Sequence, residues 1–556
     1  MADHKVKIFC VNTGETYEVE MGASLSDIAK QLNIKLKYSV LGAQVNNKNI
    51  GLTYKVYQPK KVFFFDITHP EGRRMYLRSL AMMLIVAVRQ TLPGVNFKLT
   101  HSVSRGIYCE LHRDHQCSVS LDDVDVIKKR MRDMVKEKLP IVREEVETTE
   151  ALRILANDYA TVRLLQQHGD IYTTIHRLDG EAAVLFGDLV PNTSIVDIWD
   201  IIPYFDGMLL RVPSTKNPEL LGDMVKQDKM FSIFQEFDSW LKLMHVRYLS
   251  DINNAIIKGY GDQIIQVSEA LHEKKISQIA DMIAERRDKV KVVLISGPSS
   301  SGKTTFSKRL GVQLVVNRIR PVTLSIDNYF VNREQTPRDE NGDYDFEAVE
   351  AIDVDLFNKQ LLALTRGEEV EIPKFNFKTG SRYYDGEKLQ MHEGDVLVIE
   401  GTHGLTPEVT SQIPSEVKFR IYAAPLSGIN FDPNTRIATT DNRLIRRIVR
   451  DYQTRGYSAQ ETLARWASVR RGEDRYIYPN QEEADVMFNS NLLYELCVLK
   501  TKAEPMLMEV APNSPEYAEA RRLIKFLSYF KVMSADNIPP TSILREFMGG
   551  SSFKYD

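Results

Sequence analysis

The first 66 residues alternate apolar and polar positions in short runs. Alternation over residues 5–11 and 16–21 predicts two strands, because successive strand side chains point to opposite faces. Apolar residues at helical spacing predict a short helix over 25–32. Strand-like runs then resume over 40–47 and 54–66. This order of strands around one helix predicts a β-grasp domain.

Longer patterns follow in the rest of the chain. Apolar residues recur at helical spacing over 231–256 and 276–290, which predicts amphipathic helices. Largely apolar runs over 290–295 and 394–400 are typical of strands buried on both faces of a parallel sheet. One further helix is expected over 514–530. We predict a multidomain α/β protein made of a β-grasp domain (1–66), a second N-terminal domain (67–216), a helical connector (217–289), a doubly wound parallel sheet (290–500) and a C-terminal helical tail (501–556).

Composition changes this picture little. The 556 residues are 43% hydrophobic and 26% charged, as in ordinary soluble proteins. A net charge of −3 gives no global basic field that would attract nucleic acid or an anionic membrane. The four cysteines lie far apart, the N-terminus lacks a signal-peptide pattern, and the apolar run 80–88 is far too short to span a membrane. We therefore expect a cytoplasmic protein without membrane contact.

The sharpest chemical signal is a glycine-rich loop between a strand and a helix. The pattern GxxxxGK[ST] runs from Gly297 to Thr304, directly after the apolar run 290–295. The amides of such a loop bind phosphate oxygens, and Lys303 reaches the β- and γ-phosphates. The Thr304 hydroxyl is suited to Mg²⁺. The predicted ATP contacts in this segment are Gly297, Pro298, Ser299, Ser300, Ser301, Gly302, Lys303, Thr304 and Thr305.

Two acidic residues end predicted strands. Asp327 stands at the carboxyl end of a second strand, where open α/β sheets gather their chemistry. A carboxylate there can accept the proton of an acceptor hydroxyl that attacks the γ-phosphate. Glu400 ends the run 394–400 and is suited, together with Thr304, to hold Mg²⁺. These acids favour a kinase over a protein that only binds nucleotide.

Arginines cluster further along the chain. Between Arg436 and Arg475 the sequence has ten arginines and no lysine. Arg443, Arg447 and Arg450 recur at helical spacing, so we expect them on one helix face. Guanidinium groups bind phosphate oxygens bidentately and stay charged when desolvated, which suits a lid over ATP. A solvated basic face or an RNA-binding patch is the alternative interpretation.

Segments between residues 290 and 490 form a specific series, namely GPSSSGKTT, SIDNYF, YDFEAVEAID, IPKFNFKTGSR, VLVIEG, RLIRRIVRD and YPNQEEADVMFN. In this order they resemble the uridine kinase and phosphoribulokinase family. The resemblance implies that Asp327 is the catalytic base and that Glu400 and Thr304 serve Mg²⁺. It also implies phosphate contacts or lid closure for the matching arginines. The predicted phosphate-handling residues outside the loop are Arg447, Arg450 and Arg455, with Arg447 grouped with Lys303 as catalytic.

The acceptor pocket departs from that family. Uridine kinases bind the ribose hydroxyls with an aspartate where ungapped alignment places Glu347, two residues after Asp345. They read the base with a tyrosine and a histidine, where this chain has Phe375 and a glycine. The tyrosine that uridine kinases carry three residues after the catalytic base is Phe330 here, and Tyr329 supplies a ring one place earlier. These losses leave the base specificity open. The predicted acceptor contacts are Tyr329, Asp345, Glu347, Phe375, Phe377 and Arg382.

The first 215 residues carry a second series. GASLSDIAKQL and LGAQVNNKNIGL resemble a TGS domain. EGRRMYLRSLAMMLIVAVRQTLPG, SVSRGIYCEL, LDDVDVIKKRMRDMVKEKLPIVREEV and FGDLVPNTSIVDIW resemble, in order, the α+β editing domain of threonyl-tRNA synthetase. The positions of the synthetase's metal ligands are here Met82, Val86, Leu185 and Leu189, which cannot bind zinc. The resemblance implies an RNA-binding or regulatory module, or a packing domain without a ligand.

Together these patterns predict an ATP- and Mg²⁺-dependent kinase that phosphorylates a small acceptor, with the 5′-OH of a nucleoside as the favoured site. A sugar phosphate is the alternative acceptor. An alternative of another class is a nucleotide-gated regulator that binds tRNA or the ribosome through the N-terminal domains. ATP and the acceptor are the expected partners, while RNA contact and homo-oligomerisation stay open.

Overall fold

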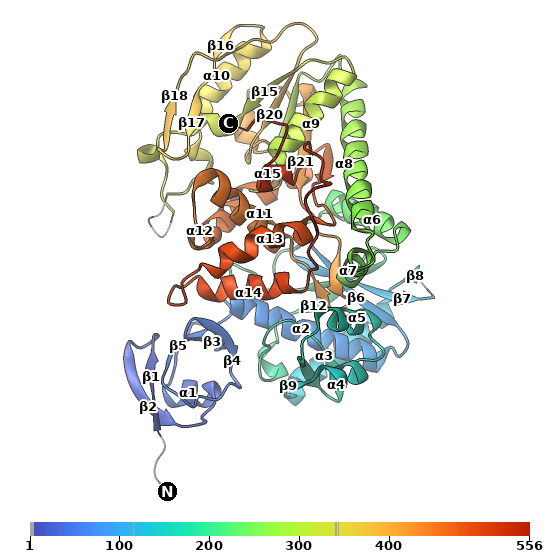
Figure 1. The fold of residues 1–556 in the computed structure, drawn as a ribbon, viewed down its shortest axis with the longest axis vertical. Helices are drawn as coiled ribbons and strands as arrows, with labels where there is room; N and C mark the ends of the chain where they lie inside the picture. Colours follow the sequence, from blue (N-terminus) through green and yellow to red (C-terminus); the bar gives the residue numbers. More distant parts are fainter. Residues whose placement is uncertain (1–4, 115, 340–341, 343, 556) are drawn as a thin grey trace.

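The computed structural model describes residues 5–114, 116–339, 342 and 344–555. The N-terminal unit is a five-stranded sheet in the order β2-β1-β5-β3-β4, with β1 parallel to β5 and one helix packed on it (Figure 1). Its elements are β1 (Lys5–Cys10), β2 (Glu15–Glu20), α1 (Leu25–Gln31), β3 (Gly42–Val45), β4 (Lys48–Gly51) and β5 (Lys60–Phe65). The predicted β-grasp order is confirmed, with β4 as an additional edge strand.

A long buried helix organises the second unit. Helix α2 (Pro70–Thr91) packs between a sheet of order β12-β13-β7-β6 and a three-stranded sheet of order β11-β10-β9. The other elements are β6 (Asn96–Val103), β7 (Gly106–Arg113), β8 (Gln116–Cys117), α3 (Leu121–Glu137), β9 (Val142–Glu147), α4 (Thr148–Ile154), α5 (Tyr159–His168), β10 (Tyr172–Leu178), β11 (Glu181–Ala183), β12 (Asp200–Tyr204) and β13 (Gly207–Arg211). Met82, Val86, Leu185 and Leu189 lie together in the buried apolar cluster of this unit. Their hydrocarbon and thioether groups therefore serve as core.

The segment predicted as a helical connector, with helices over 231–256 and 276–290, contains three helices, α6 (Asp228–Leu243), α7 (Leu249–Ile257) and α8 (Gly261–Ala284). They do more than connect. The isoleucines of α8 share one apolar core with Phe306 and Leu310 of the following unit, so α8 is a layer of that unit. In the described residues, no helix combines the length and apolar character that crossing a membrane requires.

The next unit is built on an all-parallel sheet of order β15-β20-β14-β21-β24. Its strands are β14 (Val292–Ser296), β15 (Pro321–Ser325), β20 (Val396–Glu400), β21 (Lys418–Ala424) and β24 (Val486–Asn489). Its main helices are α9 (Lys303–Val316), α10 (Val354–Thr365), α11 (Thr439–Arg450) and α12 (Ala459–Gly472). Because parallel strands end at one edge, the segments that follow β14, β15 and β20 meet there. The predicted doubly wound fold is confirmed (Figure 1).

The C-terminal segment returns to the parallel-sheet unit. Helix α13 (Glu495–Met508) crosses the boundary that the sequence predicted at residue 500, and α14 (Tyr517–Ser528) and the short α15 (Arg545–Met548) follow it. Ser542, Ile543, Leu544 and Phe547 are fully buried, and the three apolar side chains belong to the same core as α8 and α9. The tail is therefore part of the packed unit (Figure 1).

A chain of ion pairs joins the N-terminal half to the parallel-sheet unit. Arg74 of α2 contacts Glu519 of α14 at 2.7 Å, and Glu519 contacts Arg522 at 2.7 Å. Arg522 then donates two hydrogen bonds of 2.8 Å to Asp441 in the first turn of α11. Burial alone would raise the pKa of Glu519, but Arg522 and Arg74 override it and lower this pKa to about 2. The carboxylate is thus held charged between α2 and α11.

Arg522→Ala should destabilise the protein by about 1–3 kcal/mol, because Glu519 and Asp441 lose a shared cation in a largely desolvated position. Urea denaturation measures the loss. Arg521 is the matched control, since it is exposed and adjacent, and Arg521→Ala should change the free energy of unfolding by less than about 0.5 kcal/mol. Equal effects of the two substitutions would contradict a stabilising role for the ion-pair chain.

Candidate active site

Two glycines give the phosphate loop its shape. A Cβ on Gly297, directly after β14, would lie 2.0 Å from the carbonyl oxygen of Ala423 on β21. Gly302 caps α9 with φ of +84°, and a Cβ there would lie 2.5 Å from Ile543. Neither position accepts a side chain without a shift of its surroundings. The predicted loop is therefore formed, and its glycines are required for steric reasons.

The loop amides fall into two groups. Pro298 has no N–H, and the N–H of Ser299 donates to Glu473 Oε1 at 3.1 Å, so these two residues offer no free amide. Ser301 donates to the Pro298 carbonyl at 3.2 Å, and Thr305 donates to Glu546 at 3.1 Å. Among the described residues, no acceptor binds the amides of Ser300, Gly302, Lys303 and Thr304. Four adjacent free donors at a helix N-terminus fit a phosphate chain.

Polar side chains of the loop also lack partners. The hydroxyls of Ser300 and Ser301 are buried, and neither has a hydrogen-bond partner in the described part of the chain. The Lys303 ammonium donates to the carbonyls of Gly297 at 2.9 Å and Pro298 at 3.3 Å, across the loop. Buried groups of this kind are costly without a ligand. The loop thus fits a polyphosphate, with Lys303 close enough to contact it.

The predicted Mg²⁺ ligands lie together. The Thr304 hydroxyl donates to Glu400 Oε1 at 3.5 Å, and Ser325, at the end of β15, donates to the same oxygen at 3.0 Å. These hard oxygen donors are of the type that Mg²⁺ prefers. Burial, and then the neighbouring Asp327, raise the pKa of Glu400 to about 7, which a bound cation would reverse. Ser325 was not identified in the sequence, although it is the last residue of a strand that ends at the site.

Asp327 lies beside these groups on the 3₁₀ turn Ile326–Tyr329 that follows β15. Burial raises the pKa of its carboxyl, while Lys303, Arg455 and Arg450 act in the opposite direction. These four charged groups therefore converge at the sheet edge. A desolvated carboxylate near cations is suited to accept a proton in a reaction.

Three arginines gather around one aspartate. Asp451 contacts Arg447 at 3.2 Å, Arg450 at 2.8 Å and Arg455 at 3.7 Å. Arg447 also donates to the Ser299 hydroxyl at 2.8 Å, so it reaches the phosphate loop. Repulsion from Arg450, and then burial, lower the pKa of Arg455 to about 10. The predicted arginines are thus brought together. Asp451 was not identified in the sequence, where an acid after Arg450 reads as a helix-surface residue.

Arg443 does not face the site with Arg447, Arg450 and Arg455. Its side chain is fully buried, pairs with Glu473, and donates from Nε to the Ser299 carbonyl at 3.0 Å. Arg446 is likewise buried and pairs with Glu495. The expectation that Arg443 lines a lid face is wrong, because that part of α11 packs into the core beneath the loop. Both arginines support the loop from behind.

Glu347 is the acidic acceptor residue that faces the site. Burial, followed by repulsion from Glu473, raises its pKa to about 7, while Arg447 and Lys303 oppose that shift. It packs so closely on Gly472 that a Cβ there would lie 2.2 Å from the Cβ of Glu347. Asp345 instead accepts a hydrogen bond of 3.2 Å from the Glu347 amide. The structure thus distinguishes the two predicted acids, and Asp345 shapes the backbone of Glu347.

An aromatic cluster lies at the rim of the site. The rings of Phe330, Phe375 and Phe377 have centroids 5.2–6.0 Å apart, and Arg455 lies 5.0 Å from the centre of the Phe377 ring. Tyr329 is not part of it. Its ring is buried, and its hydroxyl donates to Gln360 at 2.6 Å. The expectation for Tyr329 is wrong because Phe330, the next residue, carries the ring on the site side.

Arg382 lies opposite Phe375 in the short ribbon of β17 (Lys374–Asn376) and β18 (Ser381–Tyr383). Its guanidinium donates to Asp353 at 2.8 Å, at the N-terminus of α10. The structure therefore places Arg382 near the aromatic cluster but pairs its charge with another residue.

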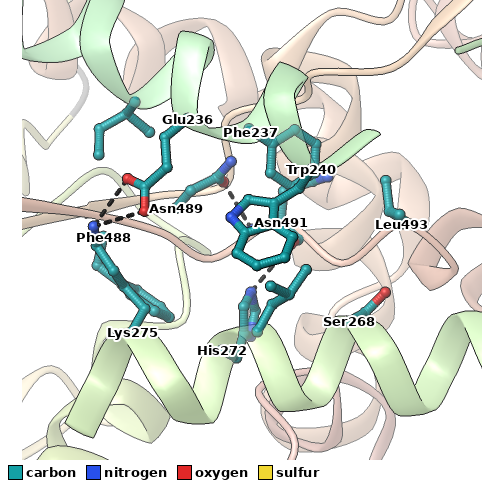
Figure 2. Close-up of a pocket in the computed structure, with 12 residues that line it drawn as sticks. Glu236, Phe237, Trp240, Ser268, His272, Lys275, Phe488, Asn489, Asn491 and Leu493 are labelled. Carbon is teal, nitrogen blue, oxygen red and sulfur yellow. Dashed lines mark hydrogen bonds and ion pairs between the residues drawn. The ribbon is translucent and has the colours of Figure 1, made fainter. Parts of the chain in front are cut away.

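A separate cavity of about 70 Å³ lies between α6, α8 and the end of β24 (Figure 2). Phe237, Trp240 and Phe488 line it, and the Glu236–Lys275 ion pair lies at its side. None of the predicted site residues lines it. This cavity is mainly apolar and offers no phosphate cradle.

Comparison with known proteins agrees with this geometry. Residues 292–493 match the model of the Phosphoribulokinase / Uridine kinase family. The matched region is similar to kinases of that family. It carries the phosphate loop, Asp327, Glu400 and the arginines around Asp451.

Individual relatives cover different parts of the chain. Uridine kinase of Ureaplasma urealyticum is 26% identical over 196 residues, which are 35% of this chain and 86% of that protein. Threonine--tRNA ligase of Porphyromonas gingivalis is 26% identical over 185 residues, which are 33% of this chain and 28% of that protein. The chain thus spans little more than a quarter of the ligase, and this similarity belongs to the N-terminal region.

Solved kinases are similar to parts of the chain at low identity. A possible uridine kinase from Bacillus stearothermophilus is 19% identical with a TM-score of 0.27, and covers 38% of this chain and 99% of its own. A fructose transport system kinase described as putative, from Silicibacter sp. TM1040, is 17% identical with a TM-score of 0.28, and covers 38% of this chain and 98% of its own.

The raised pKa of Glu347 predicts a pH-dependent stability. The carboxyl keeps its proton in the folded protein up to a pKa of about 7, against 4.5 for an ordinary glutamate. The contribution of this carboxyl to the free energy of unfolding is complete below pH 4.5 and is lost as the pH rises through about 7. Glu347→Gln should reduce the fall in unfolding free energy between about pH 5 and pH 8 by about 1–3 kcal/mol. Urea denaturation across this range measures it. The exposed Glu350→Gln is the control, and a slope that Glu347→Gln leaves unchanged would contradict the assignment.

Proposed function

We propose that this protein transfers the γ-phosphate of ATP to a hydroxyl of a small acceptor, and that the acceptor is a nucleoside phosphorylated at its 5′-OH. The observation that carries the proposal is the convergence of Asp327 with Lys303, Arg450 and Arg455 beside the phosphate loop. A base, a loop of free amides and a group of guanidiniums are the parts that phosphoryl transfer requires.

The donor would be held by the free loop amides and by Lys303. Thr304 and Glu400, with Ser325 beside them, would hold Mg²⁺, which neutralises charge on the phosphates when bound. Arg447 reaches Ser299 of the loop and would contact the transferred phosphoryl group. Arg450 and Arg455 would contact the same group. Their positive charge stabilises the negative charge that spreads over the phosphoryl oxygens in the transition state.

Asp327 would act as the general base. Its buried position raises its proton affinity, while the nearby Lys303, Arg455 and Arg450 act in the opposite direction. The proton leaves the acceptor hydroxyl as the oxygen attacks phosphorus and is kept on the Asp327 carboxylate. The bond from the γ-phosphorus to the oxygen that bridges it to the β-phosphate breaks, so the products are ADP and a phosphate monoester of the acceptor.

The acceptor side favours a nucleoside over a sugar phosphate. Glu347 faces the site and can accept hydrogen bonds from ribose hydroxyls, while Phe330, Phe375 and Phe377 offer ring faces for a planar base. A phosphorylated sugar would need a free cation here, and Arg382 is paired with Asp353. The loss of tyrosine and histidine donors leaves the choice of base to shape and stacking.

The N-terminal units support a second, additional role. Their similarity to threonine--tRNA ligase favours contact with RNA, and the Arg74–Glu519–Arg522–Asp441 chain would connect such contact to α11. In this proposal the protein works in the cytoplasm. Residues 1–66 and 67–216 form the RNA-directed units. Residues 217–289 join these units to the kinase, which is formed by 290–500 and the tail 501–556 and includes α8 in its core.

Asp327→Asn should retain Mg²⁺·ATP and lose turnover by about a hundred- to ten-thousandfold, because the amide cannot accept the proton. Binding is followed by calorimetry and turnover by acceptor-dependent ADP release. The exposed Asp355→Asn is the matched control and should turn over normally. Normal turnover by Asp327→Asn would remove Asp327 as the base.

A screen of nucleosides and phosphorylated sugars identifies the acceptor, and Glu347→Gln tests how it is held. At about pH 8, where Glu347 is ionised, the substitution should raise KM for a nucleoside about ten- to a hundredfold with a smaller change in kcat. Glu350→Gln should leave both constants unchanged. Turnover with sugar phosphates alone would exclude the nucleoside, and ATP consumption that responds to RNA but to no acceptor would favour the regulator.

A further inference from the structure

The C-terminal segment brings a carboxylate to the phosphate loop. Glu546 of α15 accepts hydrogen bonds from the amide of Thr305 at 3.1 Å and from its hydroxyl at 2.6 Å. The hydroxyl of Tyr555 lies 2.9 Å from the same Thr305 oxygen. Figure 1 shows this last segment, in dark red, beside α9 and α11. Thr305 was predicted to contact ATP, yet both of its polar groups are engaged by the tail.

Thr305 is a phosphate position by its place in the helix. It is the third residue of α9, so its amide has no acceptor within the helix and points toward the N-terminal end. Loops of this pattern use such amides for the α- and β-phosphates, while Lys303 serves the β- and γ-phosphates. Thr305, two residues further along, belongs to the part of the cradle nearer the nucleoside. Glu546 thus places an anion where the donor would place one of its own.

The carboxylate of Glu546 is carried by a tightly packed helix, α15. Ser542, Ile543, Leu544 and Phe547 are fully buried around it. The Ser542 hydroxyl donates to Glu269 at 2.5 Å, and Ile543 packs on Gly302 of the loop. The backbone of α15 is therefore fixed, and the Glu546 side chain is the part that can rotate away.

The charge of Glu546 also acts on the rest of the site. It is close enough to Glu400 to contribute to the raised pKa of that carboxyl, after burial and Asp327. A third acid at a site built for an anionic donor weakens donor binding by repulsion. A helix cap alone would be supplied as well by a neutral serine or asparagine.

We infer that Glu546 competes with the phosphate donor for the loop, and that its carboxylate holds the α-phosphate position until the nucleotide displaces it. This inference rests on the proposed function, since it takes ATP as the donor. The donor gains Thr305 only by breaking the two hydrogen bonds to Glu546. Affinity for ATP is therefore lower than the loop alone would provide.

The first test is calorimetric titration of the full chain with Mg²⁺·ATP. Glu546→Gln keeps the size and an acceptor oxygen but removes the charge, and it should lower Kd for ATP about tenfold. The control is Glu509→Gln, since Glu509 is an exposed acid of the same C-terminal region, and its Kd should equal that of the unaltered chain. An unchanged or higher Kd for Glu546→Gln would show that Glu546 only caps α9 and would overturn the inference.

The second test needs no substitution and so covers a variant that fails to fold. A crystal structure of the unaltered chain with Mg²⁺ and a non-hydrolysable ATP analogue should show the Glu546 carboxylate turned away from Thr305 and the α-phosphate at the Thr305 amide. A Glu546 carboxylate that still accepts both hydrogen bonds from Thr305 with the nucleotide bound overturns the inference even if the protein phosphorylates acceptors normally. Conversely, tighter ATP binding by Glu546→Gln without phosphorylation of any acceptor supports the inference and removes the proposed reaction. Failure of every chain to bind ATP overturns both.

Discussion

The phosphate loop depends on two fully buried arginines of α11. Arg443 pairs with Glu473, which in turn accepts the Ser299 amide, and Arg446 pairs with Glu495. Loss of one partner would leave an uncompensated buried charge, a change that costs about 3–5 kcal/mol. Because these pairs fix α11 against the loop, the next residue on the exposed side, Arg447, is held at the Ser299 hydroxyl. The position of Arg447, which we propose contacts the transferred phosphoryl group, therefore follows from ion pairs buried in the core.

The site itself holds like charges close together. Burial raises the pKa of three carboxyl groups, those of Asp327, Glu347 and Glu400. The arginines of the site lie around a fourth acid, Asp451. Arg450 is close enough to lower the pKa of Arg455 to about 10. Repulsion within both sets of charges means that a phosphate chain with its cation would relieve each group at once. Such an arrangement is destabilising by itself, as is expected where function opposes stability.

The parts that sequence predicted were those that local patterns specify. Strand, loop and helix follow one another directly over residues 292–316, so the loop and Lys303 could be placed. Asp327 and Glu400 followed because parallel strands end together. The failures have physical causes. Helical spacing groups Arg443 with Arg447 but does not say which turns are buried. Neighbours on a tight turn face opposite ways, which separated Tyr329 from Phe330. Glu546 meets Thr305 across 241 residues, and no local pattern encodes such a contact.

The tail explains why the two halves of the chain form a single body. Glu519 on α14 contacts Arg74 of the N-terminal half, and Arg522 from the same helix contacts Asp441 of α11. Further along, α15 is packed beneath the phosphate loop. Any shift of α2 relative to α11 must therefore separate charges that are held in a desolvated position. Since α11 also carries Arg443, Arg446 and Arg447, such a shift acts on the loop through the ion pairs that fix it. The tail, in which the sequence shows no chemical signal, thus links the N-terminal half to the helix that supports the phosphate loop.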